Sequence, residues 1–313
     1  MEDNELILNS TIYDKKSIIV QANELVRSKK DDLSLIEAKL IRLAIGQILK
    51  EDTDLRTYSC EIVDLARFLG ISSDNIYRDV KGINESLMKK YIYIEDPTKR
   101  DSKGNPKYKM FHWFDTAEYE NGIITYKISE NLKPFLLGLE RFFTKYGYES
   151  IAALPSDYAI RLYELLASFQ NLTVSKERRN DFDIEIEKNE IVFDIKWLRT
   201  YFSCEKKYPN TGDFMKRVID GSVSAIQKYT DMHLTHRTVK SGRFIKYVIF
   251  KIHTWYDPGY NEMLKQLKEG ERAQYKLKGE PLPEPSVIAP PDVNTAQNVP
   301  VWLTDDMEGI NHD

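Results

Sequence analysis

The sequence contains little of what secreted and membrane proteins use. Only two cysteines, Cys60 and Cys204, occur in 313 residues, and no Cys-x-x-Cys pair is present. This excludes a disulfide framework and a thiolate zinc site, so we expect two buried thiols. No apolar run approaches the roughly 18 residues that cross a bilayer, and the acidic start Met-Glu-Asp-Asn-Glu lacks the basic residues of a signal peptide. We therefore expect a cytosolic protein with no membrane partner.

Motifs of catalysis are also missing. The sequence has no G-x-x-x-x-G-K phosphate loop, no G-x-S-x-G motif and no H-E-x-x-H motif. Among its five histidines, His233 and His236 stand three apart in an expected strand, where they point to opposite faces. The histidine pair that rolling-circle nickases use with a tyrosine is absent. We expect no enzyme activity, no metal and no cofactor.

The net charge of −4 conceals an uneven distribution of charge. Residues 196–254 contain 12 Lys+Arg against 4 Asp+Glu, whereas residues 257–313 contain 5 against 11. A compact basic segment beside an acidic tail is typical of a surface that neutralises phosphates. A solvated surface without a partner is the alternative.

Residues 17–150, called module one below, follow a polar segment over 1–16 that we expect to be a flexible arm. The expected elements are strand 17–21, helix 22–28, helix 33–50, helix 61–69, helix 73–90, a strand from 91, a polar loop 96–107, strand 109–116, strand 123–128, helix 130–139 and an extended stretch 142–148. Ser34 and Glu37 form a capping box for the third element. Asn121-Gly122 is a strong hairpin signal. A helix pair joined by a short turn and followed by a hairpin predicts a winged helix.

The pattern repeats over residues 151–256, called module two. The expected elements are a helix after Pro155, strand 191–195, helix 197–202, helix 211–229 and strands 232–239 and 244–254. A hairpin again follows a helix pair, so we predict an α+β protein of two tandem winged-helix domains with a boundary near residue 150. Residues 257–313 are expected to form a charged extension and, from 279, a proline-rich disordered tail. Within that tail, residues 299–303 around Trp302 are a candidate docking segment, with a plain disordered end as the alternative.

The helix 211–229 is the expected recognition helix of module two. With Phe214, Val218 and Ile226 facing inward, its other face can enter a major groove. Arg217 can hold guanine O6 and N7 with two hydrogen bonds and is the predicted base reader, while Lys216 is expected at a phosphate. The other predicted DNA-contacting residues are Asp213, Asp220, Ser224 and Gln227 on the helix, Lys206, Lys207 and Tyr208 before it, and Arg237, Lys240, Arg243 and Lys246 in the wing.

Module one offers a weaker version of the same surface. Its predicted DNA-contacting residues are Asn75, Arg78 and Lys81 on the second helix of the pair, and Lys99, Arg100, Lys103 and Lys107 in the expected wing loop. Acidic neighbours dilute this charge, namely Asp74, Asp79, Asp96 and Asp101. Weak DNA binding and contact with another protein both remain open.

Three stretches of the sequence resemble the theta-type plasmid replication initiators, the Rep proteins that bind iterons. They are Leu40-Ile41-Arg42-Leu43-Ala44, the helix SDYAIRLYELL over 156–166 and GDFMKRVI over 212–219, in order and at suitable spacing within residues 17–254. The resemblance implies binding of tandem repeats at a plasmid origin, origin opening with host proteins such as a helicase or initiator, and autoregulation by a dimer. It also implies that module two makes the main DNA contact, while module one dimerises and assists. Gly221 departs from the family, in which relatives often carry proline.

The leading hypothesis is therefore a replication initiator that binds double-stranded DNA repeats without covalent chemistry. A winged-helix transcriptional regulator, which would favour a palindromic operator, is the first alternative. A nicking enzyme, which would form a covalent tyrosine link to DNA, is the second.

Overall fold

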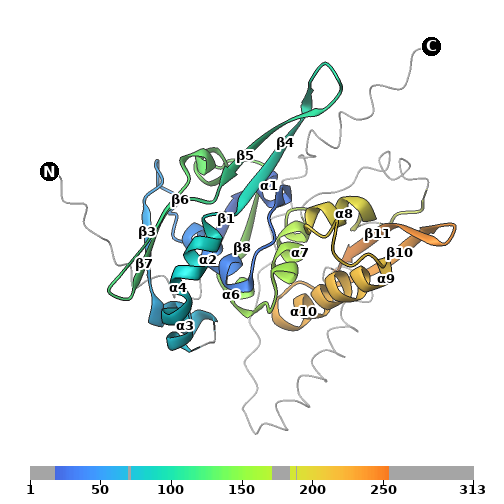
Figure 1. Ribbon diagram of the computed structural model, residues 1–313. Helices are drawn as coiled ribbons and strands as arrows, with labels where there is room; N and C mark the ends of the chain where they lie inside the picture. The colour runs from blue at the N-terminus through green and yellow to red at the C-terminus, as the bar shows by residue number, and fades with distance from the viewer. Residues whose placement is uncertain (1–17, 70–71, 171–183, 188, 254–313) are drawn as a thin grey trace, which may run out of the picture.

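The computed structural model describes residues 18–69, 72–170, 184–187 and 189–253 (Figure 1). The expected arm over 1–16, the charged extension and tail over 257–313 and the candidate docking segment at 299–303 lie outside these residues. None of the helices that are described is both long and apolar enough to span a bilayer.

Module one contains most of the expected helices and strands, with four differences. A strand at 29–30 and a helix at 148–153 were not predicted, the strand expected over 109–116 is divided between two strands, and the helix expected over 130–139 is two short turns. Its elements are β1 (Ile18–Ala22), α1 (Asn23–Arg27), β2 (Lys29–Lys30), α2 (Leu35–Gly46), β3 (Thr57–Glu61), α3 (Ile62–Leu69), α4 (Ser73–Leu87), β4 (Tyr91–Arg100), β5 (Pro106–His112), β6 (Phe114–Glu120), β7 (Ile123–Ile128), η2 (Glu130–Leu132), α5 (Lys133–Leu136), β8 (Phe143–Gly147) and α6 (Tyr148–Ala153). The capping box is confirmed, since the Ser34 amide donates to Glu37 Oε2 (2.7 Å) and the Glu37 amide donates to Ser34 Oγ (3.3 Å).

Module two contains α7 (Asp157–Ala167), β9 (Glu190–Asp194), α8 (Ile195–Tyr201), α9 (Thr211–Phe214), η4 (Met215–Asp220), α10 (Gly221–Tyr229), β10 (Leu234–Ser241) and β11 (Phe244–Ile252). The two modules share one sheet topology. The strand before the helix pair joins the second strand of the following hairpin, which gives the orders β3-β7-β6 and β9-β11-β10, with every pairing antiparallel. The α+β class with two winged helices is therefore confirmed.

The polar loop expected over 96–107 is instead part of a long hairpin, so this prediction was wrong. Strand β4 continues to Arg100 and β5 begins at Pro106. The two strands pair with each other, and β4 also pairs with β2, so neither belongs to the wing sheet. The Asp101 carboxylate closes the turn by accepting from the amides of Lys103 (2.8 Å) and Asn105 (2.9 Å). The wing of module one is the next hairpin, β6–β7, so Lys99, Arg100, Lys103 and Lys107 do not lie in it.

The β6–β7 turn gives a direct test of backbone strain. Asn121 (φ 49°) and Gly122 (φ 84°) are both in the left-handed region, as a type I′ hairpin turn requires. A Cβ on Gly122 would also lie 3.0 Å from the Tyr77 hydroxyl. We expect Gly122→Ala to lower the free energy of unfolding by about 1–2 kcal/mol in urea titrations.

Gly82 provides the matched control for this substitution. It lies within α4, and a Cβ there would meet nothing within 4 Å. Gly82→Ala should therefore raise the free energy of unfolding by roughly 0.5–1 kcal/mol. Equal effects of the two substitutions would contradict the role assigned to the turn.

Helix α7 lies on the side of module two that faces module one (Figure 1). On the module-one side, Arg42 of α2 forms a two-pronged ion pair with Glu164, Nε to Oε1 at 2.8 Å and Nη2 to Oε2 at 2.6 Å, and both side chains are 1% exposed. On the other side, Arg161 donates to the carbonyl of Tyr201 in α8. Helix α7 thus joins the modules through buried charged groups.

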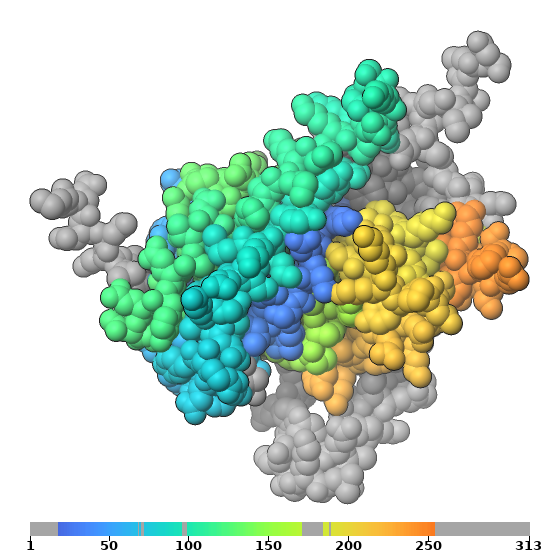
Figure 2. Space-filling model, viewed as in Figure 1, coloured from blue at the N-terminus to red at the C-terminus, as the bar shows by residue number. Residues whose placement is uncertain are grey.

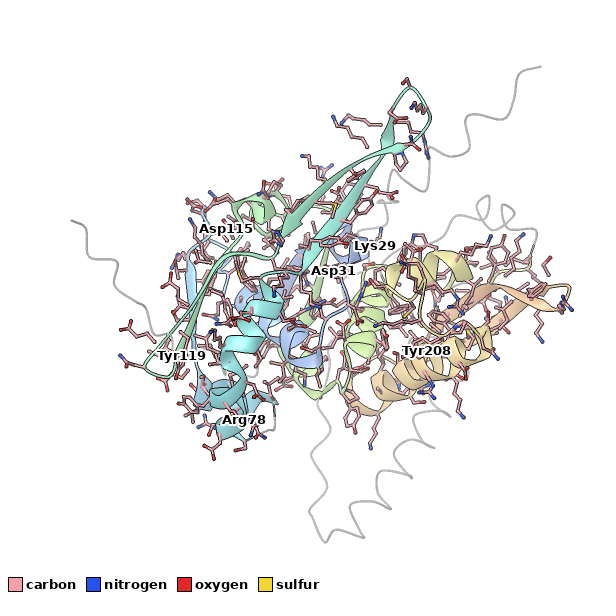
Figure 3. The ribbon with its side chains drawn as sticks, viewed as in Figure 1. Lys29, Asp31, Arg78, Asp115, Tyr119 and Tyr208 are labelled. Atoms are coloured by element: carbon pink, nitrogen blue, oxygen red, sulfur yellow. The ribbon has the colours of Figure 1, made fainter. Side chains whose placement is uncertain are left out.

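A second junction connects the segment around β2 to the loop that precedes the recognition helix. Lys29 Nζ lies 2.5 Å from Glu205 Oε1, and Ser203 Oγ donates to the carbonyl of Lys30. Lys207 forms an ion pair with Asp32. Figure 3 shows Lys29 and Asp31 on the module-one side of this junction and Tyr208 on the module-two side. The loop before the recognition helix is therefore attached to module one.

Candidate nucleic-acid interface

The recognition helix of module two is continuous from Thr211 to Tyr229, as α9, η4 and α10. The Asn210 side chain caps it by accepting from the amide of Gly212 (2.7 Å). The expected inward residues Phe214, Val218 and Ile226 are fully buried. Of the six residues placed on its outer face, Gln227 is half-buried and five are exposed, namely Asp213, Lys216, Arg217, Asp220 and Ser224. The helix thus presents two adjacent cations, Lys216 and Arg217, on its solvent side.

The middle of this helix differs from the regular α-helix that the sequence pattern predicts. Met215–Asp220 is a π-helical turn, in which the Gly221 amide donates to the carbonyl of Lys216, five residues back. The hydrophobic spacing from Phe214 to Ile226 fits an α-helix equally well, so periodicity alone could not reveal the wider turn.

Two of the residues predicted on the helix have partners within the protein. His236 Nε2 of β10 donates to Asp220 Oδ1 (2.9 Å), and Gln227 Nε2 donates to the carbonyl of Leu234 (2.6 Å). Both contacts tie the recognition helix to the wing strand. These partners come from another segment of the chain, so the helical periodicity of the sequence could not predict the contacts.

The wing of module two is a tight hairpin with a cationic tip. Gly242 has φ of 59°, and Arg243 after it is not in the left-handed region, as in a type II′ turn. The strands slip register beside Lys240, so Val239 pairs with Tyr247 and Lys240 pairs with Ile245. The exposed cations here are Lys240, Arg243 and Lys246. Figure 2 shows this hairpin at the edge of the molecule, where its tip projects.

Arg237 differs from the other predicted wing cations. Its Nε and Nη2 donate to the two carboxylate oxygens of Glu190 (3.0 and 2.9 Å), and Nη2 also donates to the carbonyl of Glu185 (2.7 Å). The hydrogen bond to Glu190 raises the pKa of Arg237 above its ordinary value. The guanidinium therefore holds β10 to Glu190 at the start of β9 and to Glu185 before it, and the Glu190 carboxylate balances its charge.

Phe244 at the wing tip was not among the predicted site residues. It is 65% exposed, more than any other large apolar side chain of the described residues, and the Arg243 guanidinium lies 5.0 Å from its ring centre. The sequence signal that could have identified it is a phenylalanine that follows a glycine turn and lies between cations. The exposed Phe244 ring adds an apolar surface to the cationic wing.

Only part of the loop before the recognition helix is able to contact a ligand. Lys206 is exposed, whereas Lys207 is paired with Asp32. Tyr208 has φ of 50° and packs its ring edge-on against Tyr158, 6.5 Å between ring centres. Of these three predicted residues, Lys206 is thus the best placed to reach a ligand.

The corresponding surface of module one is more nearly neutral. Asn75, Arg78 and Lys81 are exposed on α4, but Arg78 pairs with Asp79 (3.1 Å) and Lys81 lies 3.8 Å from Glu85. The wing exposes three acidic side chains, Asp115, Glu118 and Glu120. Figure 3 shows Arg78 on α4 and Tyr119 near the wing tip.

The remaining cations predicted in module one lie on the β4–β5 hairpin. Lys99, Arg100, Lys103 and Lys107 are all exposed there. The hairpin projects from the body of the protein (Figure 2), and Arg100 Nη1 donates to the carbonyl of Gly104 (3.1 Å). The structure therefore places these cations apart from α4 and the wing.

We also searched for side chains that could bind a metal ion and for reactive thiols. Within the described ranges, no group of three or more His, Cys, Asp and Glu side chains could hold a metal ion. Cys60 and Cys204 are both buried and form no disulfide, as expected, and burial raises the pKa of the Cys204 thiol.

Together, the two modules define a tandem winged-helix protein whose second module carries the more cationic helix and wing. Residues 18–167 match the family described as Initiator Replication protein, WH1, and residues 194–252 match Initiator Rep protein, WH2. The chain belongs to this family of initiator replication proteins, which confirms the resemblance found in the sequence. The first match includes α7, and the domain boundary near residue 150 stays a prediction.

Two similar proteins illustrate the relationship. An Escherichia coli protein described as an uncharacterized 27.6 kDa protein is 22% identical over 257 residues, which cover 77% of this chain and 97% of that protein. The crystal structure of the Pi initiator protein in complex with iteron DNA has a TM-score of 0.55 at 18% identity, and the match covers 78% of this chain and 100% of that one. The second similarity shows a shared fold.

Proposed function

We propose that this protein initiates plasmid replication by binding tandem repeats, or iterons, in double-stranded DNA at the origin and promoting origin opening. The observation that carries the proposal is the exposed cationic face of module two in a member of the initiator family. Lys216 and Arg217 on the recognition helix and the wing cations can engage one duplex together. The iteron complex of the Pi initiator, which shares the fold, supports duplex DNA as the ligand.

Within this proposal, Arg217 reads a base pair, and Lys206, Lys216, Lys240, Arg243 and Lys246 neutralise phosphates. Module one dimerises in a form that represses the protein's own gene and thereby helps control copy number, and it assists DNA binding through Asn75, Arg78 and Lys81. The β4–β5 cations add charge to that module. The protein acts in the bacterial cytoplasm with host replication proteins such as a helicase or initiator, and it performs no covalent chemistry.

A footprint on the DNA that flanks the gene tests the proposal. We expect protection of tandem direct repeats at physiological salt, with clear preference over random duplex. Equal affinity for both duplexes would overturn origin binding, and a single protected palindrome would favour a transcriptional regulator. Strand cleavage with a covalent tyrosine link would reveal a nicking enzyme instead.

The wing gives a prediction of its own. Lys240→Ala should weaken binding to preferred and random duplex similarly, because a phosphate contact carries no sequence information. The slope of log affinity against log salt should become shallower by about 1. Titrations at several salt concentrations measure this, with Ser241→Ala as the neighbouring uncharged control. A loss confined to the preferred duplex would exclude a phosphate contact.

A further inference from the structure

The π-helical turn lies in the part of the recognition helix that carries the exposed cations. In a regular α-helix, the Gly221 amide would donate to the carbonyl of Arg217, four residues back. It donates to Lys216 instead. A Cβ at Gly221 would come no closer than 3.7 Å to that carbonyl, so glycine is not required there by steric contact. The hydrogen bond, rather than crowding, distinguishes this turn.

The wider turn changes how the outer face is arranged. In an α-helix, residues four apart drift by about 40° around the axis, so a stripe of such residues winds around the helix. A π turn holds more residues per turn and offsets this drift. Lys216, Asp220 and Ser224, which are all exposed, therefore stay nearly in line.

A straight stripe suits a ligand with a regular repeat. Lys216 and Ser224 are separated by at most roughly 12 Å along the helix, since 1.5 Å per residue is the α-helical rise and the wider π turn rises less per residue. This distance corresponds to about three to four base-pair steps of 3.4 Å. The π turn thus determines which side chains can face one groove together.

A second contact holds the same turn from the wing side. His236 donates to Asp220 (2.9 Å), the last residue of the turn, and its ring lies 6.0 Å from the ring of buried Phe250. The side chains of His236 and Asp220 are 22% and 50% exposed. The π turn is therefore fixed at one end to a strand of the wing, so helix and wing keep a defined relative position.

We propose that Gly221 and His236 are positioning residues that set the register in which the recognition helix reads duplex DNA. Gly221 closes the π turn through its amide, and His236 holds Asp220 against the wing strand. Asp220 then serves this contact rather than reading a base. The proposal rests on the proposed function, because it specifies how the same face discriminates base pairs.

Two disruptive variants and two matched controls test the proposal. Gly221→Pro introduces the residue that relatives often carry at this position and removes the amide donor to Lys216, His236→Ala removes the contact to Asp220, and Gly221→Ala keeps the donor. Thr238→Ala changes an exposed residue on the same face of β10 and is the control for His236. The probes are a short duplex selected by the wild-type protein from a randomised pool, its scrambled form, and its single base-pair variants.

We expect Gly221→Pro and His236→Ala to reduce the ratio of selected to scrambled affinity by about tenfold or more, since misplaced side chains lose base contacts worth that much. Affinity for the scrambled duplex should change little, and the losses should fall at the base pairs read from the helix. Gly221→Ala and Thr238→Ala should keep the wild-type ratio and pattern.

An unchanged ratio, or equal losses on both duplexes, would overturn the proposal. If the melting temperature shows that Gly221→Pro is unfolded, a double-mutant cycle of His236→Ala and Asp220→Ala decides it. If the two side chains act through their contact, the ratio of selected to scrambled affinity in the double variant should equal that of the more affected single variant. Losses that add up in the double variant would contradict a role for the contact. A wild-type protein that cannot discriminate would overturn the proposed function itself, whereas a discriminating wild type with unaffected variants overturns the positioning role alone.

Discussion

Replacing Glu164 by alanine is expected to lower the free energy of unfolding by about 3–5 kcal/mol, the cost of leaving a buried charge without its partner. The substitution leaves the Arg42 guanidinium, 1% exposed, with no carboxylate. It also removes the acceptor for the Tyr146 hydroxyl. Urea unfolding followed by circular dichroism measures the loss.

The control is a double substitution, Arg42→Met with Glu164→Leu. It removes both charges and keeps apolar volume, so it should recover most of the lost stability. A decrease below about 1 kcal/mol for Glu164→Ala would show that the pair contributes no more than a surface ion pair.

Acidification should reproduce part of the stability loss expected for Glu164→Ala, because it neutralises the Glu164 carboxylate. Burial alone would raise the pKa of Glu164, but the charge and hydrogen bonds of Arg42 outweigh it and hold that pKa below its ordinary value. Because the folded-state pKa is lowered, the stabilisation is present above the unfolded pKa of about 4.3 and is lost as the pH falls below it.

Arg217→Ala is expected to cost about 1–3 kcal/mol on the preferred duplex and to relax the preference at one base pair. Arg217 is exposed on the outer face of the recognition helix, one residue beyond Lys216. A guanidinium can donate two parallel hydrogen bonds to a guanine edge, and alanine can donate none. Binding to a set of duplexes with single base-pair changes locates the affected position.

Lys216→Ala is the matched comparison for this prediction. It removes the adjacent cation, which is expected to meet a phosphate, and should weaken all duplexes by similar factors. If Arg217→Ala reduced affinity equally on preferred and random DNA, Arg217 would be a phosphate contact and not a base reader.

Local signals in the sequence determined most of the secondary structure. The capping box at Ser34, the left-handed turn at Asn121-Gly122 and the spacing of Phe214, Val218 and Ile226 each depend on residues close together in the chain. Such features act through backbone hydrogen bonds and one-sided burial, which short segments specify alone. The helix that carries Phe214 and Val218 also contributed one of the three stretches of the family resemblance, GDFMKRVI over 212–219.

The tertiary structure alone decided which charged side chains remain available at the surface. Arg237 binds Glu190, 47 residues away, and Arg42 binds Glu164, 122 residues away. It also decided that the β4–β5 cations lie outside the wing, because β4 pairs with β2. A side chain's charge can be read from the sequence. Whether an opposite charge neutralises it depends on which distant segments the fold brings within a few ångströms.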